Sequence, residues 1–289
     1  MKLQEWQDQG KFFQFKNHRI FYQDGGEGTP LLLIHAYPTA SWGFHKLWPS
    51  LIQHFRVVAP DLLGSGFSDK PEEESYGIGV LADLVQELLQ SLEIGETHLL
   101  AHAYGVTTAQ ELLARQVDQQ LSFQILSACF INGGLFPEAT HLAPIQKFLL
   151  TPLGASIAPL VPTPYSVFCK QLSRTFGPNT PPTEADFQEF WQLLRFHEGQ
   201  RVVPQVLTYL KEREVQRDRW VGALLHAQIP LCLINGAADP VSGKDIPKRW
   251  QELLPQSPLV QLDPRIGHYP PFEDPEGVLK AYLEFMKKG

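Results

Sequence analysis

The sequence predicts an α/β fold: a doubly wound, mostly parallel sheet that is interrupted by one inserted helical segment. Three observations predict this class. Short apolar runs alternate with segments of helical periodicity over residues 1–134. The alternation stops over residues 135–221, which are rich in proline and contain no convincing strand pattern, and it resumes over residues 222–289. Repeated strand–helix units are typical of a parallel sheet with right-handed crossovers.

The first part of the chain, residues 1–134, is expected to supply most strands of the sheet. Phe12–Phe15 and Arg19–Gln23 have the pattern of an opening hairpin. Continuous apolar runs follow, as expected of parallel strands that are covered on both faces. These strands are Pro30–His35, Arg56–Pro60, Thr97–Ala101 and Gln124–Ile131. Helical spacing predicts helices at Phe44–Phe55, Ile78–Leu92 and Tyr104–Gln116.

Residues 135–221 are expected to form a helical cap domain. Their clearest helix is Glu184–Phe196, with Thr183 as its N-cap. Ligands bind at the carboxyl edge of the strands in an open α/β sheet, so a helical insertion there predicts a lid over the site. The second part of the core, residues 222–289, completes the sheet. Its strands are Ile229–Asn235 and Leu259–Leu262, and its helices are Lys244–Leu254 and Pro275–Lys287.

Composition excludes several classes of function. The formal charge of −7 and the lack of a basic run argue against binding to nucleic acid or to an anionic membrane. No apolar stretch of about 18 residues predicts a membrane span, and the first residues lack the apolar region of a signal peptide. The three cysteines are widely spaced, as expected of buried thiols in a reducing compartment. We therefore expect a cytoplasmic protein, without a metal or another cofactor.

The chemistry is expected to centre on the junction between a buried strand and a helix, at Ala101-His-Ala-Tyr-Gly105. Hydrolases of one fold place their nucleophile on such a strained turn, with small residues two positions before and two positions after it. Ala101 and Gly105 meet this requirement around position 103. The residue at that position is Ala103, which has no nucleophilic atom.

Three further segments follow strand ends in the order that such a hydrolase requires. Asp239, in Asn235-Gly-Ala-Ala-Asp-Pro240, stands where an orienting acid is expected. His268, in Ile266-Gly-His-Tyr-Pro270, stands where the catalytic histidine is expected. His35-Ala-Tyr-Pro38 follows the strand that supplies an amide to the oxyanion hole. Chance does not explain four such segments in the right order.

Together these segments resemble the α/β-hydrolase fold family, and within it the subset that contains epoxide hydrolases and haloalkane dehalogenases. The resemblance covers nearly the whole chain, the cap included. Within that subset it extends in particular to the mesoderm-specific transcript proteins and their bacterial relatives. The motifs that carry this last likeness are Asn132-Gly-Gly-Leu-Phe-Pro137, Arg219-Trp-Val-Gly-Ala223 and His268-Tyr-Pro through Glu273-Asp-Pro275. Those family members have aspartate at the position of Ala103.

The resemblance implies a mechanism with a covalent intermediate. A carboxylate at position 103 would attack an electrophilic carbon, and His268, oriented by Asp239, would activate the water that cleaves the resulting ester. The backbone amides of Tyr37 and Tyr104 would form the oxyanion hole. Cap tyrosines protonate the opening epoxide oxygen in epoxide hydrolases.

Tyr209 resembles one of these tyrosines, and Tyr165 is a second candidate. Trp191 joins them as a candidate substrate-binding residue, although its helical spacing with Phe187 is also typical of cap core.

Three explanations of Ala103 remain open: an engineered substitution that disarms the enzyme, a natural loss of function, or catalysis by another residue. Tyr104 and Val106 fit a turn with aspartate better than one with serine, so aspartate is the favoured parent residue. His35 and His102 are expected to hydrogen-bond the neighbouring turns.

The favoured function is hydrolysis of an epoxide of a hydrophobic small molecule, in a chain that is inactive as it stands. A serine-type esterase, a catalytically dead ligand-binding protein and a β-lactone decarboxylase remain alternatives. Dehalogenation is disfavoured because Tyr37 and Tyr104 occupy the places where dehalogenases of this family hold halide with asparagine and tryptophan. The oligomeric state is not predicted.

Overall fold

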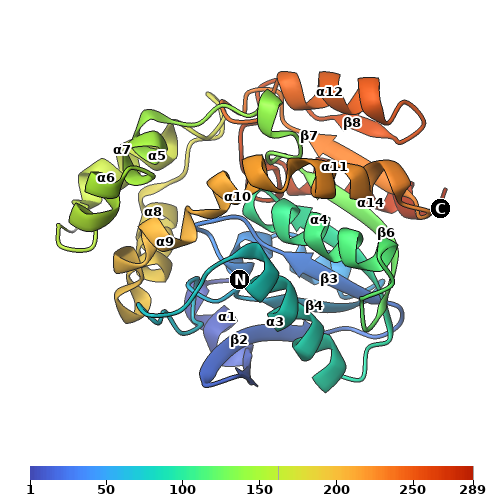
Figure 1. Ribbon diagram of the computed structural model, residues 1–289, viewed down its shortest axis with the longest axis horizontal. Helices are drawn as coiled ribbons and strands as arrows, with labels where there is room; N and C mark the ends of the chain where they lie inside the picture. Colours follow the sequence, from blue (N-terminus) through green and yellow to red (C-terminus); the bar gives the residue numbers. More distant parts are fainter. Residues whose placement is uncertain (162, 289) are drawn as a thin grey trace.

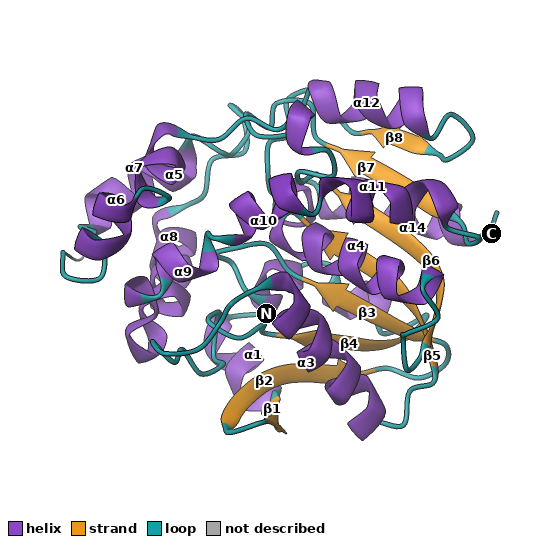
Figure 2. Ribbon diagram, viewed as in Figure 1, coloured by secondary structure: helices purple, strands orange, loops and turns teal. Residues whose placement is uncertain are grey.

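A mostly parallel, eight-stranded sheet forms the centre of the computed structural model, which describes residues 1–161 and 163–288 (Figure 2). Its strands are β1 (Lys11–Phe15), β2 (His18–Gly25), β3 (Pro30–Ile34), β4 (Arg56–Pro60), β5 (Glu96–His102), β6 (Gln124–Ile131), β7 (Leu231–Asn235) and β8 (Leu259–Gln261). Their order is β1-β2-β4-β3-β5-β6-β7-β8. The β1–β2 and β2–β4 pairs are antiparallel, and the other pairs are parallel. The predicted fold class is confirmed.

Strand β3 shows why the parallel strands are continuously apolar. Leu31 and Leu33 belong to one buried cluster, whereas Leu32 and Ile34 belong to another on the opposite face of the sheet. Successive side chains of a strand point to opposite faces, so a strand between two helical layers buries every residue. All four of these side chains are inaccessible to solvent.

The helices outside the inserted segment are α1 (Leu3–Gln9), η1 (Ser41–Phe44), α2 (Trp48–Leu51), α3 (Ile78–Ser91), α4 (Tyr104–Val117), α12 (Asp245–Leu253), α13 (Pro270–Glu273) and α14 (Pro275–Met286). Of these, α3, α4, α12 and α14 lie where the periodicity predicts them, and α13 was not predicted. The single helix predicted at Phe44–Phe55 is wrong: η1 ends and α2 begins anew at Trp48. Pro49 has no N–H and is tolerated only in the first turn, so the helix restarts there. Helix α1 was not predicted.

The described residues of the inserted segment form helices and connecting loops, without a strand. After η2 (Pro137–Ala139) come α5 (Pro144–Leu149), α6 (Pro152–Ile157), α7 (Tyr165–Ser173), α8 (Glu184–Arg195), η3 (Phe196–Arg201), α9 (Val203–Val206), α10 (Tyr209–Val215) and α11 (Arg217–His226). Thr183 is the N-cap of α8, and its hydroxyl accepts a hydrogen bond from the Asp186 amide at 3.2 Å. No helix among the described residues is long and apolar enough to cross a membrane.

Helices α5–α9 project beyond one edge of the sheet, whereas α11 lies along α4 (Figure 1). The domain boundary expected after residue 221 therefore falls inside α11, a helix that packs on the core. The reason is that α11 presents Trp220 and Leu224 to the buried cluster that also contains Leu112 of α4. The position of the domain boundary itself stays a prediction.

Candidate active site

Ala103 occupies the turn between β5 and α4 in a strained conformation. Its φ of 50° and ψ of −100° are rare for a residue with a Cβ atom, and such strain collects at functional sites. The neighbouring backbone holds the turn: the Ala103 amide donates to the Ile131 carbonyl at 3.2 Å, and the Gly105 amide donates to the His35 carbonyl at 3.0 Å. A Cβ atom on Gly105 would clash with the Ile34 carbonyl, so glycine is required there.

A histidine and an acid from two other loops meet beside this turn. His268 Nδ1 lies 2.8 Å from Asp239 Oδ2, and both residues are at least nine-tenths buried. Asp239 also accepts hydrogen bonds from the Val241 amide at 2.8 Å and from the Ser242 hydroxyl. The acid is therefore fixed by three donors and orients the imidazole.

The pKa values of this pair shift in opposite directions. Burial raises the pKa of Asp239, but the charge and hydrogen bond of His268 outweigh it, and the net pKa lies below the ordinary value. Burial lowers the pKa of His268, but the Asp239 carboxylate outweighs it, and the net pKa lies above the ordinary value. The charge of Arg213 opposes that rise. The pair thus favours an imidazolium, the species that a general base forms after taking a proton.

Two polar residues that the sequence reasoning missed hold the loops in place. Asn132 donates to the Gly267 carbonyl at 2.9 Å and accepts from the Gly236 amide at 2.8 Å, so it links the acid loop to the histidine loop. Glu273 accepts from the amides of Gly267 and Tyr269, each at 2.9 Å. An asparagine directly after a buried strand is the only local signal that could have indicated the first of these roles.

Both histidines next to the turn are engaged structurally, as predicted. His35 Nε2 accepts from the Leu62 amide at 2.9 Å, while Nδ1 donates to the Ala36 carbonyl at 2.8 Å. His102 Nε2 lies 2.7 Å from the His268 carbonyl. Burial lowers the pKa of His102 to about 3, so this ring is neutral and donates.

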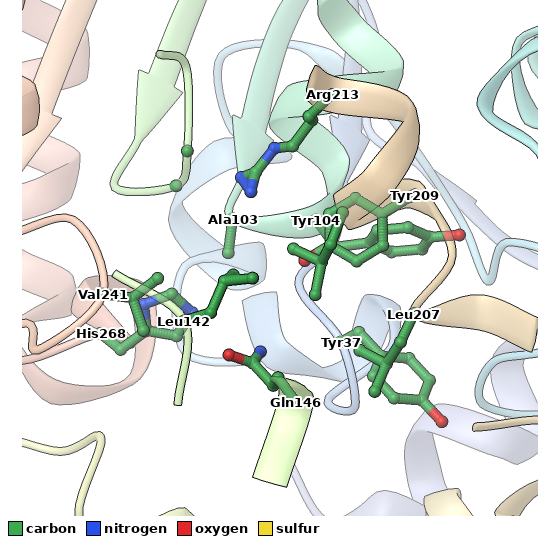
Figure 3. Close-up of a pocket in the computed structure, with 13 residues that line it drawn as sticks. Tyr37, Ala103, Tyr104, Leu142, Gln146, Leu207, Tyr209, Arg213, Val241 and His268 are labelled. Carbon is green, nitrogen blue, oxygen red and sulfur yellow. The ribbon is translucent and has the colours of Figure 1, made fainter. Parts of the chain in front are cut away.

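A small cavity of about 60 Å³ brings most of the predicted residues together. Ala103, His268, Tyr37, Tyr104 and Tyr209 all line it (Figure 3). In this view Ala103 lies between His268 and the tyrosines. Tyr104 is the first residue of α4, so its amide has no acceptor within the helix, as an oxyanion-hole donor requires.

The other two substrate-binding candidates, Tyr165 and Trp191, do not line this cavity. Tyr165 donates its hydroxyl to Glu184 Oε1 at 2.7 Å and packs its ring against Trp191, with ring centroids 5.6 Å apart. Both lie on cap helices, α7 and α8. Their assignment as substrate-binding residues stays a prediction.

The cavity also contains a cation that the sequence reasoning missed. Arg213 of α10 is 4% exposed, and its guanidinium carbon lies 5.2 Å from the centroid of the Tyr209 ring. Tyr209 and Arg213 are four residues apart, so they share one face of the helix. That spacing, read together with the candidate tyrosine, is the signal that could have found Arg213.

The chain belongs to a known protein family. Residues 29–275 match the family model described as alpha/beta hydrolase fold, and the chain is therefore a member of this family. It is 39% identical to "Mesoderm-specific transcript protein" of Mus musculus, over 98% of this chain and 88% of that protein. It is 34% identical to "Putative hydrolase LipZ" of Mycobacterium tuberculosis, over 98% of each chain.

Solved structures agree on the fold. The epoxide hydrolase CorEH superimposes with a TM-score of 0.77 at 21% identity, covering 96% of this chain and 98% of that one. The haloalkane dehalogenase DatA of Agrobacterium tumefaciens superimposes with a TM-score of 0.79 at 18% identity, covering 96% of each chain. At these identities the likeness extends to the fold alone.

Proposed function

We propose that the parent form of this chain carries aspartate at position 103 and hydrolyses an epoxide of a small molecule through an ester on that aspartate. The observation that carries the proposal is the His268–Asp239 pair, whose histidine lines one cavity together with a strained strand-to-helix turn. The histidine, the acid and the turn are present, and only the nucleophilic side chain is missing. Hydrolase activity itself fits the family to which the chain belongs.

The first step is ring opening. A carboxylate oxygen at position 103 attacks an epoxide carbon, the carbon–oxygen bond of the ring breaks, and the new C–O bond completes an alkyl-enzyme ester. The departing oxygen becomes an alkoxide and takes a proton from a donor. Tyr209 is the donor we propose, because it lines the cavity and packs on Tyr104 with ring centroids 4.7 Å apart.

The second step is hydrolysis of that ester. His268 takes a proton from water, and the hydroxide adds to the ester carbonyl carbon. The resulting oxyanion accepts hydrogen bonds from the amides of Tyr37 and Tyr104. It then collapses: the C–O bond to the alkyl group breaks, and the departing alkoxide takes the proton from His268 and leaves as the diol. The proton of the remaining carboxylic acid passes to the Tyr209 phenolate, which restores the free carboxylate. Asp239 stabilises the imidazolium formed at His268, in keeping with its effect on the histidine pKa.

Substitution of Ala103 tests this proposal. We expect the Ala103→Asp variant to hydrolyse epoxides at least about a thousandfold faster than the unsubstituted chain, because loss of a nucleophile costs that much or more. Ala103→Ser is the matched control and should not act on epoxides. Both variants are assayed against epoxides, haloalkanes and aryl esters. Activity of the serine variant alone, on esters, would overturn the proposal in favour of a serine-type esterase.

The covalent intermediate can be observed directly. In an Ala103→Asp, His268→Gln double variant the ester should form but not be hydrolysed. Intact-protein mass spectrometry should then show an increase equal to the mass of the epoxide. No increase, together with no turnover by the single variant on any substrate class, would instead favour a ligand-binding protein.

A further inference from the structure

Arg213 has no acidic partner among the described residues, although it is almost completely buried. None of the ion pairs or hydrogen bonds that the structure shows involves its guanidinium, and Nε is buried without an acceptor. Burial lowers the pKa of the guanidinium, but arginine stays charged in proteins. A buried unpaired charge is costly, and such a charge in a cavity indicates a ligand of opposite sign.

The nearby carboxylates are already engaged. Asp239 accepts from His268, Ser242 and the Val241 amide. Glu212, the residue before Arg213, accepts from the Ile78 amide at 3.0 Å and so caps α3. Neither acid forms an ion pair with Arg213.

The loop after β6 makes room for the guanidinium beside position 103. A Cβ atom on Gly134 would clash with the guanidinium nitrogens of Arg213. A Cβ atom on the preceding residue, Gly133, would lie 2.9 Å from Ala103 Cα. Two consecutive glycines thus allow Arg213 and the Ala103 turn to approach the same piece of backbone. Figure 3 shows the guanidinium directed toward the region of Ala103.

Much of the remaining cavity wall is aliphatic, and the other polar groups on it, apart from His268, are neutral. Leu142, Leu207, Leu210 and Val241 form the aliphatic part, beside Gln146 and the tyrosines. Among the described residues that line the cavity, Arg213 carries the fixed positive charge. The cavity volume is only about 60 Å³, so the group that approaches the guanidinium is small. A compact apolar body that bears one anionic group fits this combination.

We infer that Arg213 binds the carboxylate of the substrate, and that the enzyme acts on small epoxy acids. This inference rests on the proposed function for the reaction, and it adds the substrate class. The guanidinium forms paired N–H···O hydrogen bonds with the carboxylate and holds the neighbouring epoxide carbon in front of position 103. An ion pair with the nucleophile itself would stabilise its ground state and slow attack, so the substrate is the better partner.

Ligand binding tests the inference on the protein as it exists, without any turnover. Butyrate and butyramide have similar shapes and differ in charge. By calorimetry at neutral pH we expect the chain with Ala103 to bind butyrate at least about tenfold more tightly than butyramide. Arg213→Met should remove this preference, whereas Arg213→Lys, which keeps the charge, should retain part of it. Arg219→Met is the matched control, because that arginine lies outside the cavity and should not change the preference.

Two results of this titration would overturn the inference. The first is equal binding, or no binding, of the two ligands to the unsubstituted chain. The second is loss of butyrate binding in Ala103→Asp, which would mean that the partner of Arg213 is the nucleophile carboxylate. Because no step depends on catalysis, this test can succeed even if no substitution at position 103 gives an active enzyme.

Kinetics provide an independent measurement once the Ala103→Asp variant is active. Oxirane-2-carboxylate and oxirane-2-carboxamide are the matched substrates. Adding Arg213→Met should raise KM for the carboxylate at least about tenfold more than KM for the amide. An equal fall in kcat for both substrates would instead mean that Arg213 acts on the opening oxygen, and would overturn its role in substrate binding.

Discussion

The chain places arginine in two contrasting environments on α10 and α11, which are adjacent in sequence. Beside α11, Glu111 accepts hydrogen bonds from Arg115 at 3.0 Å, Arg219 at 3.0 Å and Trp220 at 2.8 Å. On α10, Arg213 is 4% exposed and has no acidic partner among the described residues. We call the first arrangement the Glu111 cluster. It consists of Glu111, Arg115, Arg219 and Trp220.

The difference separates structural charges from functional ones. Burial of a charge is compensated when hydrogen-bonded partners of opposite charge surround it, as in the Glu111 cluster, where the net pKa of Glu111 lies below its ordinary value. There burial raises the pKa of Glu111, and the hydrogen bonds from Arg219, Trp220 and Arg115 outweigh it. Arg213 receives no such compensation, so its placement is better explained by a ligand than by stability.

The largest change in the free energy of unfolding is expected from a substitution in the Glu111 cluster. Glu111→Gln removes the buried carboxylate that two arginines share and leaves them only the more exposed Asp83 and Asp118, so we expect the free energy of unfolding to fall by about 2–3 kcal/mol. Urea unfolding followed by tryptophan fluorescence measures it. Glu138→Gln is the matched control, because Glu138 pairs with Arg217 and Arg249 at 40% exposure of its side chain, and such pairs contribute little. An equal loss of unfolding free energy in Glu111→Gln and Glu138→Gln would contradict the contrast between the buried and the exposed carboxylate.

Substitution of Arg213 is expected to change the free energy of unfolding in the opposite direction. Arg213→Met replaces an unpaired buried charge with an apolar side chain of similar length, so the free energy of unfolding should rise by about 1 kcal/mol. The same denaturation measurement gives this value, and Arg219→Met should lower it instead. A loss in Arg213→Met comparable to that in Glu111→Gln would show that Arg213 is a structural charge.

The smallest effect is expected at the His268–Asp239 pair, two groups of opposite charge inside the site. Here we expect a change in how the free energy of unfolding depends on pH. The raised pKa of His268 contributes stability that is complete below the ordinary histidine pKa and is lost as pH rises through the folded value. The lowered pKa of Asp239 contributes stability that is lost as pH falls below the ordinary aspartate pKa. Asp239→Asn should therefore destabilise the protein more at about pH 5 than at about pH 9. A loss that is independent of pH would contradict this sign.

Local pattern was sufficient for most of the strands. Arg56–Pro60 and Gln124–Ile131 were predicted with the bounds that the structure has, because continuous apolar runs mark strands covered on both faces. The helix expected at Phe44–Phe55 failed because apolar spacing was given more weight than Pro49. The end of the cap stays a prediction, because the spacing in α11 does not tell which neighbour covers its apolar face.

Within the site, position 103, Asp239 and His268 could be found from the sequence, because each follows a strand and the order of the motifs is characteristic. Arg213 could not be found in this way. Its importance comes from its surroundings. Two glycines follow β6 next to it, the Tyr209 ring packs against it, and it has no acidic partner among the described residues. These relations join segments that are about 80 residues apart, and no local pattern encodes them.

The sequence by itself thus determined the class of fold, the turn that carries Ala103 and the acid–histidine pair, since strand periodicity and strand-end motifs are local properties. The tertiary structure alone decided which cap residues face the reacting position. It brought Tyr209 and Arg213 to the cavity and left Tyr165 and Trp191 packed on one another. The physical reason is that the path of a cap above a sheet depends on packing between distant helices.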